Sequence, residues 1–299
     1  MSFRSYLSDI KIDFMKPHKL AIMMSIFFML ASIILVCTKG LNFGIDFAGG
    51  ILIEARIEGA YEISSVREIL SEVVDEVQIQ NTGEKDLLIR VSKSDEDQQI
   101  VIKNIQDALA KNFSQIQYRK VDYVGPQVGA ELIIKGLLAL CLSFVFIMIY
   151  VWVRFDWQFG LGGIFALLHD AIVTIGFYSI TGLEFNLTSI AAVLTIIGYS
   201  INDSVVIYDR IRENLRRYKR MDLSDLINSS LNSTLSRTML TAGVTLVSIL
   251  GLILFGGENL FSFSVATFFG IVFGTYSSIY ISAPILLYLD PRKKDEESK

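Results

Sequence analysis

Residues 187 to 208 read LTSIAAVLTIIGYSINDSVVIY, and this stretch decides the fold because it is long and apolar yet holds Asn202 and Asp203. About 20 apolar residues in a helix that rises about 1.5 Å per residue cross the hydrocarbon core of a bilayer, so Asp203 lies about two-thirds of the way across. A carboxylate at that depth costs about 2.5 to 3.5 kcal/mol on insertion scales, and residues retained there usually face a partner or a proton path. The stretch therefore predicts a membrane-spanning helix whose carboxylate has a function.

The composition of the 299 residues agrees with a membrane protein. Hydrophobic residues make up 52% and charged residues 19%, whereas soluble domains carry about 25% charged residues. The mean hydropathy is +0.48. We expect no cleavable signal at the start, because a charged segment precedes the first apolar stretch and no small-x-small site follows it. Cys37 and Cys141 fall within apolar stretches, so we predict neither a metal site nor a disulfide. Six stretches are apolar enough to span as helices: residues 20–38, 132–153, 159–181, 187–208, 238–255 and 261–289.

Lysine and arginine beside the spans predict the orientation, because basic loops remain in the cytoplasm. Bases gather in residues 1–19, 210–237 and 290–299, whereas the short connections at 182–186 and 256–260 have none. We therefore predict cytoplasmic segments at 1–19, 210–237 and 290–299, a first helix at 20–38, an outer domain at 39–129 and five helices within 130–289. Topology and lipid headgroup contact explain these bases, so we predict no nucleic-acid binding. The bases at the two ends include Arg4, Lys11, Lys293, Lys294 and Lys299.

Two further patterns concern how the helices pack. Leucine and isoleucine recur at helical spacing from Asp222 to Leu235, opposite serine and asparagine, which predicts an amphipathic helix along the inner membrane surface. Gly270 and Gly274 form a GxxxG pattern in the sixth span, which favours close helix packing.

The outer region predicts the strand and helix order β-α-β-β-α-β. Residues 51–57 alternate apolar and polar as a half-buried strand does, and a helix is expected from near Ser65, with Glu68 completing a capping box. Strands are expected at 77–80 and 87–91, joined by a turn at Thr82 and Gly83, followed by a helix at 95–112 and a last strand through 116–121. This order is the ferredoxin-like arrangement, a small α+β domain of two layers. It contains no His, no Cys and no phosphate loop, so we predict no catalytic role for it.

Two glycine-rich segments frame the outer domain. The first, NFGIDFAGG at 42–50, contains Asp46, Gly49 and Gly50, and the second, VGPQVG at 124–129, contains Gly125 and Pro126. Neither has the spacing of a dinucleotide-binding or phosphate-binding loop. We predict tight turns that join the domain to the membrane helices, because glycine allows positive φ angles. A functional alternative is that both segments are hinges.

Other polar residues lie at membrane depth near Asp203. His169 and Asp170 are central in the third span, and Arg237 opens the fifth. Asp170 is either a relay or a polar clamp between helices. Arg237 either extends to the lipid headgroups or pairs with Asp203 if the fourth and fifth spans are neighbours. Asp203 itself is either a structural hydrogen-bonding residue or a proton carrier whose protonation responds to geometry. Tyr199 and Ser200, one turn before Asp203, offer hydroxyls for a water chain.

Eight short motifs lie along the whole chain. They are GIDFAGG at 44–50, VGPQVG at 124–129, LHD at 168–170, EFNLT at 184–188, GYSINDSVV at 198–206, DRIREN at 209–214, SRT at 236–238 and GTYSSIY at 274–280. These motifs resemble those of the SecD/SecF family, and several are those of its SecF branch. Ser204 and Ala48 stand where threonine is frequent in that family.

The resemblance implies an accessory subunit of Sec protein export in the bacterial inner membrane, belonging to the resistance-nodulation-division superfamily. It implies half of the bundle of that superfamily, both termini in the cytoplasm, a periplasmic soluble domain, and SecD, the SecYEG translocon and a translocating preprotein as partners. The proton-motive force would drive domain movement, with protons as the coupling ion and no other cofactor or metal. The resemblance ties Asp203 and Arg237 to proton passage, and it extends to Asp170. It implies no enzymatic activity.

We hypothesise that Asp203 is alternately protonated and paired with Arg237, and that the resulting helix shift reaches the outer domain through the glycine segments. One alternative is a structural scaffold that stabilises the translocon without conducting protons. A second, an intramembrane hydrolase using His169 and Asp170, is disfavoured because no second metal ligand or nucleophile has suitable spacing. A drug-efflux pump is also disfavoured, since such pumps have twelve spans in one chain.

Overall fold

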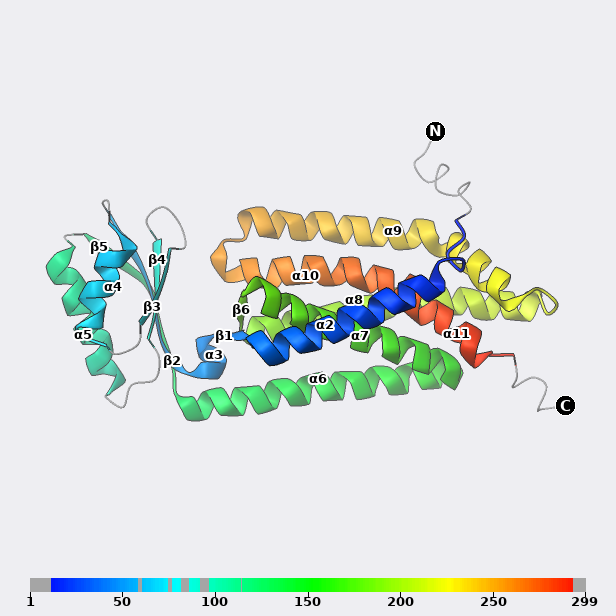
Figure 1. Ribbon diagram of the computed structural model, residues 1–299, viewed down its shortest axis with the longest axis horizontal. Coiled ribbons are helices and arrows are strands. Elements are labelled where there is room, and N and C mark those ends of the chain that lie inside the picture. Colours follow the sequence, from blue (N-terminus) through cyan, green and yellow to red (C-terminus); the bar gives the residue numbers. More distant parts are fainter. Residues whose placement is uncertain are drawn as a thin grey trace, which may run out of the picture. The chain divides into compact units, whose positions relative to one another are not determined.

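The computed structural model describes residues 12–58, 61–74, 77–81, 86–91, 97–113 and 115–292 (Figure 1). The predicted turn at Thr82 and Gly83 and the terminal bases Arg4, Lys11, Lys293, Lys294 and Lys299 lie outside these ranges. The chain divides into two compact units. The first comprises Met1–Asn42, Ala139–Glu184 and Thr188–Lys299, and the second comprises Phe43–Leu138 with Phe185–Leu187.

Six helical segments of the described chain are long and apolar enough to cross a membrane, and each coincides with one of the six predicted spans. The sixth is interrupted by a π-helix, η1. The segments are α2 (His18–Lys39), α6 (Pro126–Arg154), α7 (Trp157–Thr181), α8 (Leu187–Arg217), α9 (Leu223–Phe255) and the run α10 (Glu258–Ser277), η1 (Ser278–Ser282) and α11 (Ala283–Leu289).

Helix α7 is the most enclosed span, with 67% of its apolar window buried. It packs against α2 and α10, and α10 also packs against α9. Gly176 of α7 permits the crossing with α2, because a Cβ there would lie 2.2 Å from Ser32 Oγ and 2.8 Å from Ser32 Cα. The GxxxG pattern has the predicted effect, since a Cβ on Gly270 would lie 2.2 Å from Ile196 Cδ1 of α8.

The π-helix has a local cause in Pro284, the second residue of α11. Proline has no N–H and its ring crowds the carbonyl four residues before it, so the regular helical bonding breaks near Tyr280. The wider turn that results is typical of the π-bulges found at functional sites. Here it places Ser278 and Ser282 among buried residues of the bundle.

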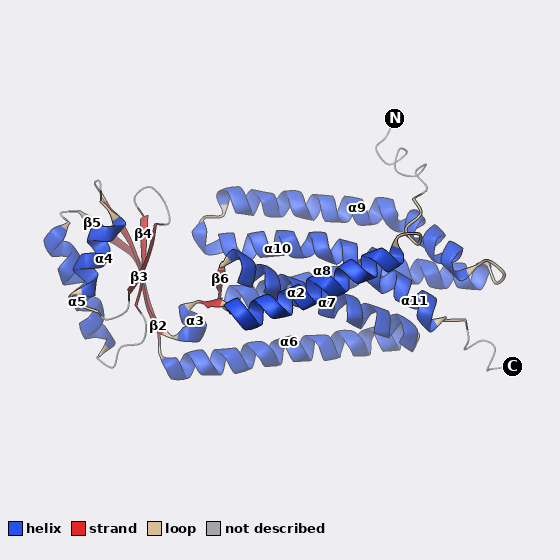
Figure 2. Ribbon diagram, viewed as in Figure 1, coloured by secondary structure: helices blue, strands red, loops and turns tan. Residues whose placement is uncertain are grey.

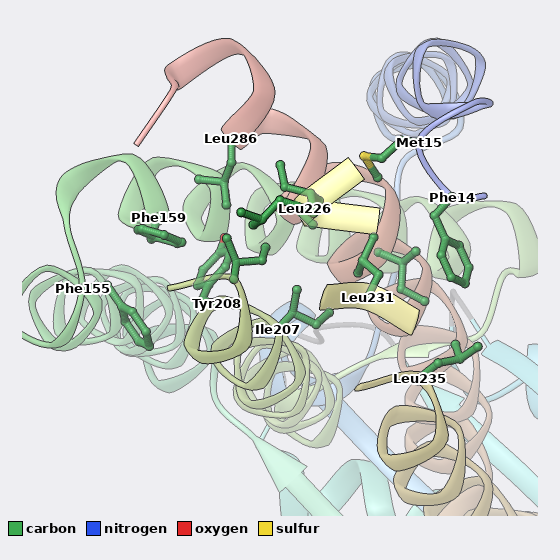
Figure 3. Close-up of a cluster of buried hydrophobic side chains, with 14 of the residues drawn as sticks. Phe14, Met15, Phe155, Phe159, Ile207, Tyr208, Leu226, Leu231, Leu235 and Leu286 are labelled. Carbon is green, nitrogen blue, oxygen red and sulfur yellow. The ribbon is translucent and has the colours of Figure 1, made fainter. Parts of the chain in front are cut away.

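The helices α8 and α9 differ from prediction at the basic segment 210–237. Helix α8 continues to Arg217 and α9 begins at Leu223, so the segment is helical except for residues 218–222. The predicted surface helix at 222–235 is the first part of α9. Its apolar side packs inside the bundle, where Leu226 and Ile227 are fully buried in the cluster that also contains Tyr208. Leu226 and Tyr208 are labelled in Figure 3. An amphipathic pattern requires an apolar partner, and that partner is protein here instead of lipid.

The second unit has the predicted ferredoxin-like order. Its four strands form an antiparallel sheet in the order β3-β4-β2-β5, with α4 and α5 on one face (Figure 2). Ile53 in β2 pairs with Ile89 in β4 and Val121 in β5, and both isoleucines are fully buried. The elements are β2 (Gly50–Ile57), α4 (Ile63–Ser71), β3 (Val77–Asn81), β4 (Asp86–Val91), α5 (Gln98–Asn112) and β5 (Ile116–Val124).

The ends of two helices in this unit correct the sequence prediction. Helix α4 begins at Ile63 after Glu62, with no side-chain cap, so Ser65 is inside the helix and the predicted capping box does not form. Helix α5 begins after Asp97, whose carboxylate accepts a hydrogen bond from the Gln99 amide at 2.9 Å. Asp97 is therefore the N-cap residue, and α5 starts later than the predicted residue 95.

Candidate proton-transfer site

Asp170 lies at the centre of a buried polar cluster in the first unit. The side chain has no exposed surface, and its Oδ2 accepts hydrogen bonds from Ser200 Oγ at 2.6 Å and Ser277 Oγ at 2.7 Å. His169 Nδ1 lies 2.9 Å from Oδ1. Asp170 thus joins three spans, α7, α8 and α10, through polar contacts away from water.

Glycine makes room for this cluster. A Cβ on Gly274 would lie 3.2 Å from Ser200 Cβ and 3.6 Å from Asp170 Oδ2. The second glycine of the predicted GxxxG therefore serves the polar site, while Gly270 serves the helix contact. This dual use explains why α10 approaches α7 and α8 closely at the depth of the carboxylate.

Beyond this cluster, two further pairs of hydroxyl groups form hydrogen bonds between α8 and η1. Ser204 Oγ lies 3.0 Å from Ser278 Oγ, and Ser282 Oγ donates to the Tyr208 hydroxyl at 2.6 Å. Ser200, Ser204 and Tyr208 are four residues apart, so they share one face of α8. Of these positions only Ser200 was predicted from the sequence.

Asp203 occupies a different face of α8 and bonds to α9. Its Oδ1 accepts a hydrogen bond from Thr238 Oγ1 at 2.7 Å. Its Oδ2 is buried and has no hydrogen-bond partner within the described residues. A buried carboxylate oxygen without a donor is unfavourable, which makes a proton or an additional group at Oδ2 favourable.

Arg237 and Asn202 lie on the surface of the bundle, where both are exposed. The contact between α8 and α9 confirms that the fourth and fifth spans are neighbours, but in the described chain Asp203 and Arg237 form no ion pair. The partner of Asp203 is instead the next residue, Thr238. Successive helical residues point about 100° apart, so only one of the two can face α8.

The remaining predicted polar residues divide into two groups. Ser200 contacts Asp170, whereas Tyr199 is partly buried among apolar residues that include Ala242 and Ile271. His169 Nε2 is buried and has no hydrogen-bond partner within the described ranges. In a catalytic triad the imidazole lies between the serine and the carboxylate. Here Asp170 lies between them, so the arrangement does not activate a serine and argues against the hydrolase alternative.

The first glycine segment lies within the second unit from Phe43 onward. Gly49 and Gly50 have φ angles of +73° and +122°, as the predicted turn requires. They follow the short helix α3 (Ile45–Ala48). Asp46 Oδ2 accepts a hydrogen bond from the Leu187 amide at 3.1 Å. Two short strands, β1 (Asn42–Phe43) and β6 (Glu184–Phe185), also occur in the chain. The phenylalanine rings of residues 43, 47 and 185 pack together.

The second glycine segment leads into α6. Pro126 is the first residue of the helix, a position where its missing N–H is not needed. Gly125 has no positive φ angle, but Gly129 makes a close contact, because a Cβ there would lie 2.9 Å from the Phe47 carbonyl oxygen. The first glycine segment is therefore a packed turn, whereas the prediction of a turn is wrong for the second, which joins the last residue of β5 to the first turn of α6 through Gly125 alone. Their role as hinges stays a prediction.

No group of three or more His, Cys, Asp or Glu side chains that could hold a metal ion occurs among the described residues. The polar groups at the site are carboxylates, hydroxyls and one imidazole. This chemistry suits the binding and release of protons.

Comparison with protein families finds two matching family models. Residues 104–292 match the family model described as "Protein export membrane protein SecD/SecF, C-terminal", and residues 34–60 match the "SecD/SecF GG Motif". The second match includes Gly49 and Gly50. Proteins named protein translocase subunit SecF from Rickettsia bellii (strain OSU 85-389) and Rickettsia felis are each 54% identical over 292 residues. These alignments cover 96% of this chain and 96% and 94% of the two relatives.

Solved structures extend the likeness to three dimensions. A crystal structure of SecDF from Thermus thermophilus, described as a translocon-associated membrane protein, matches 98% of this chain with a TM-score of 0.87 and 34% identity. A SecDF structure in a super-membrane-facing form matches 97% of it with a TM-score of 0.72 and 35% identity. This chain spans 40% of the length of each of those chains.

Proposed function

This chain belongs to the SecD/SecF family of protein export membrane proteins, and we propose that it uses the proton-motive force to promote preprotein export. It is a multi-pass membrane protein with an accessory role in Sec translocation. In the proposal it acts with SecD at the SecYEG translocon in the bacterial inner membrane. Both termini are cytoplasmic, the ferredoxin-like domain is periplasmic, and protons are the coupling ion.

The buried, unpartnered Oδ2 of Asp203 carries this proposal. This carboxylate bonds to a neighbouring helix through one oxygen, and its other oxygen has no hydrogen-bond partner among the described residues. Its hydrogen bonds therefore change when it gains a proton. Because the Thr238 hydroxyl on α9 binds the same carboxyl group, protonation alters the contact between α8 and α9. Arg237, on the exposed side of α9, supplies a positive charge that a small shift of that helix moves toward or away from Asp203.

Asp170 is the second proposed proton-transfer residue. Its cluster links α7 and α8 with the end of α10, just before the π-helix. A shift of α8 that starts at Asp203 therefore acts on the hydrogen bond to Asp170, because α8 also carries Ser200. We propose that the glycine segments pass this movement on to the soluble domain.

The energy available is sufficient for such coupling. One proton that moves through 100 mV releases about 2.3 kcal/mol. Two conformations that are both populated differ by only a few kcal/mol. One or a few protons per cycle therefore shift the balance between two arrangements of the helices.

The substitution Asp203→Asn tests the proposal, because the amide keeps the size of the carboxyl group but cannot titrate. In vesicles that contain the complete translocon with SecD, we expect this variant to lower export to the level measured without a proton-motive force. Asp209→Asn is the matched control, since Asp209 lies on the same helix, is exposed and pairs with Arg154. We expect the control to keep full stimulation.

The yield of purified complex separates this role from the scaffold alternative. Normal complex yield with lost stimulation supports proton coupling. Full stimulation in the Asp203→Asn variant contradicts it, and reduced yield with normal turnover per complex favours the scaffold.

A further inference from the structure

The chain segment before α2 is bound to α9 as a strap, which we define as residues 12–15. Asn232 accepts a hydrogen bond from the Ile12 amide at 2.8 Å and donates one to the Ile12 carbonyl at 2.7 Å. Asn228 Oδ1 accepts from the Phe14 amide at 2.8 Å. The two asparagines are four residues apart, so they lie on one face of α9 and hold the backbone of the strap at two points.

The strap inserts two side chains into the core at this end of the bundle. Phe14 and Met15 are buried there with Leu231, Leu235 and other residues of α8, α9 and η1 (Figure 3). The Phe14 ring meets the Tyr280 ring edge-on, with 6.1 Å between centroids. The asparagine contacts thus fix the depth at which Phe14 enters the bundle.

Phe14 lines a small space inside the bundle. It has no room for a water molecule, and its lining includes Thr238, the hydrogen-bond partner of Asp203. Ile207 of α8, one turn after Asp203, lies on the same lining. The other lining residues are Leu231, Thr234, Leu235 and Ile279. Five apolar side chains therefore line a dry space next to Thr238, the residue that binds the carboxyl group.

We propose that Phe14 is a gate that keeps water out of the route between Asp203 and the end of the bundle at which α9 begins. The strap is its latch, because the asparagine contacts hold Phe14 in place. This inference rests on the proposed role of Asp203 as a proton carrier. A carrier that serves two sides of a membrane must be closed to one side while it is open to the other, or protons leak. Dry apolar packing blocks proton movement because it leaves no chain of hydrogen-bonding groups.

Proton entry into liposomes tests the gate. The chain is reconstituted with its SecD partner, a membrane potential is imposed, and a pH-sensitive dye inside reports the flux. We expect Phe14→Ala to increase the flux several-fold. The double variant Asn228→Ala/Asn232→Ala, which releases the latch but keeps Phe14, should increase it as well.

Two controls make the result specific. Phe159→Ala removes a phenylalanine of the same core that does not line the closed space, so it should leave the flux unchanged. Adding Asp203→Asn to Phe14→Ala should abolish the leak. If Phe14→Ala and Asn228→Ala/Asn232→Ala both show the wild-type proton flux, the gate proposal is wrong. That result leaves the proposed role of Asp203 untouched, because the export assay tests it separately. A leak that persists without the Asp203 carboxylate also overturns the gate proposal, because the opened route then bypasses that residue.

Discussion

At Asp170, two serine hydroxyls and an imidazole surround one carboxyl group in a site closed to water. If the carboxyl group is removed, the Ser200 hydroxyl and the imidazole lose this partner, whereas the Ser277 hydroxyl keeps the Gly274 carbonyl at 3.0 Å. Leaving a buried donor unsatisfied costs about 1 to 3 kcal/mol. The cluster therefore contributes to stability whether or not Asp170 also carries protons.

Two substitutions at Asp170 separate these contributions. We expect Asp170→Ala to lower the melting temperature of the purified complex markedly, because the buried Ser200 hydroxyl and His169 imidazole lose their partner. Asp170→Asn keeps one acceptor oxygen, so it should be less destabilising but still abolish proton-driven export. If the asparagine variant exports normally, Asp170 is a structural clamp and its proposed proton role is wrong.

Thr238 is the residue through which Asp203 contacts α9. Thr238→Val keeps the shape and removes the hydroxyl, and a hydrogen bond to a charged group contributes about 1.5 to 3 kcal/mol. We expect weaker proton-driven export and a lower melting temperature. Thr241→Val is the matched control, since the Thr241 hydroxyl is on the same helix and bonds only to the Arg237 carbonyl. If Thr238→Val and Thr241→Val have equal export rates and equal melting temperatures, the contact between Thr238 and Asp203 contributes to neither.

At the residue scale, the sequence identifies the acids but not their partners. A carboxylate inside an apolar stretch is conspicuous, so Asp170 and Asp203 could be predicted. Hydroxyl residues are common in spans and often bond back to their own helix, as Thr245 and Thr275 do. Nothing in the sequence distinguishes Thr238 or Ser277 from them. The choice of Thr238 over Arg237 depends on the rotation of α9, which only the packed structure fixes.

At the element scale, α7 is held against α2 by a glycine. We expect Gly176→Ala to destabilise the complex by about 1 to 3 kcal/mol, because overpacking forces the helices apart. The added methyl group would contact the Ser32 backbone, which cannot move out of the way alone. Gly198→Ala is the control, because no atom lies within 4 Å of its Cβ position. A thermal shift assay compares them, and equal stability would contradict the account of this crossing.

The elements were largely predictable because their patterns are long. The six apolar runs and the periodicity of the β-α-β-β-α-β region can be recognised even where a single residue departs from the pattern. The ends were less predictable, since α8 continues beyond the apolar run to Arg217 and Glu62 precedes α4 in place of the expected cap. The π-helix before Pro284 also escaped prediction. A proline indicates a broken helix, but the type of turn depends on packing around Ser278 and Ser282.

At the scale of the whole molecule, the proposed function depends on polar groups in the bundle and on a soluble domain for which the sequence predicts no catalytic role. The fold of each unit followed from the sequence. The orientation in the membrane stays a prediction from the distribution of Lys and Arg. The surfaces of α6 and α9 are mostly exposed in this single chain, with only 6% and 17% of their apolar windows buried. We expect lipid or the SecD partner to cover them.

The central claim is that Asp203 gains and loses a proton as the protein works. Infrared difference spectroscopy of the reconstituted complex, recorded with and without a proton-motive force, detects the carbonyl stretch of a protonated carboxyl group directly. We predict a band that changes on energisation, is absent in Asp203→Asn and persists in Asp209→Asn. A spectrum in which no such band depends on Asp203, in a complex that exports normally, would contradict the account.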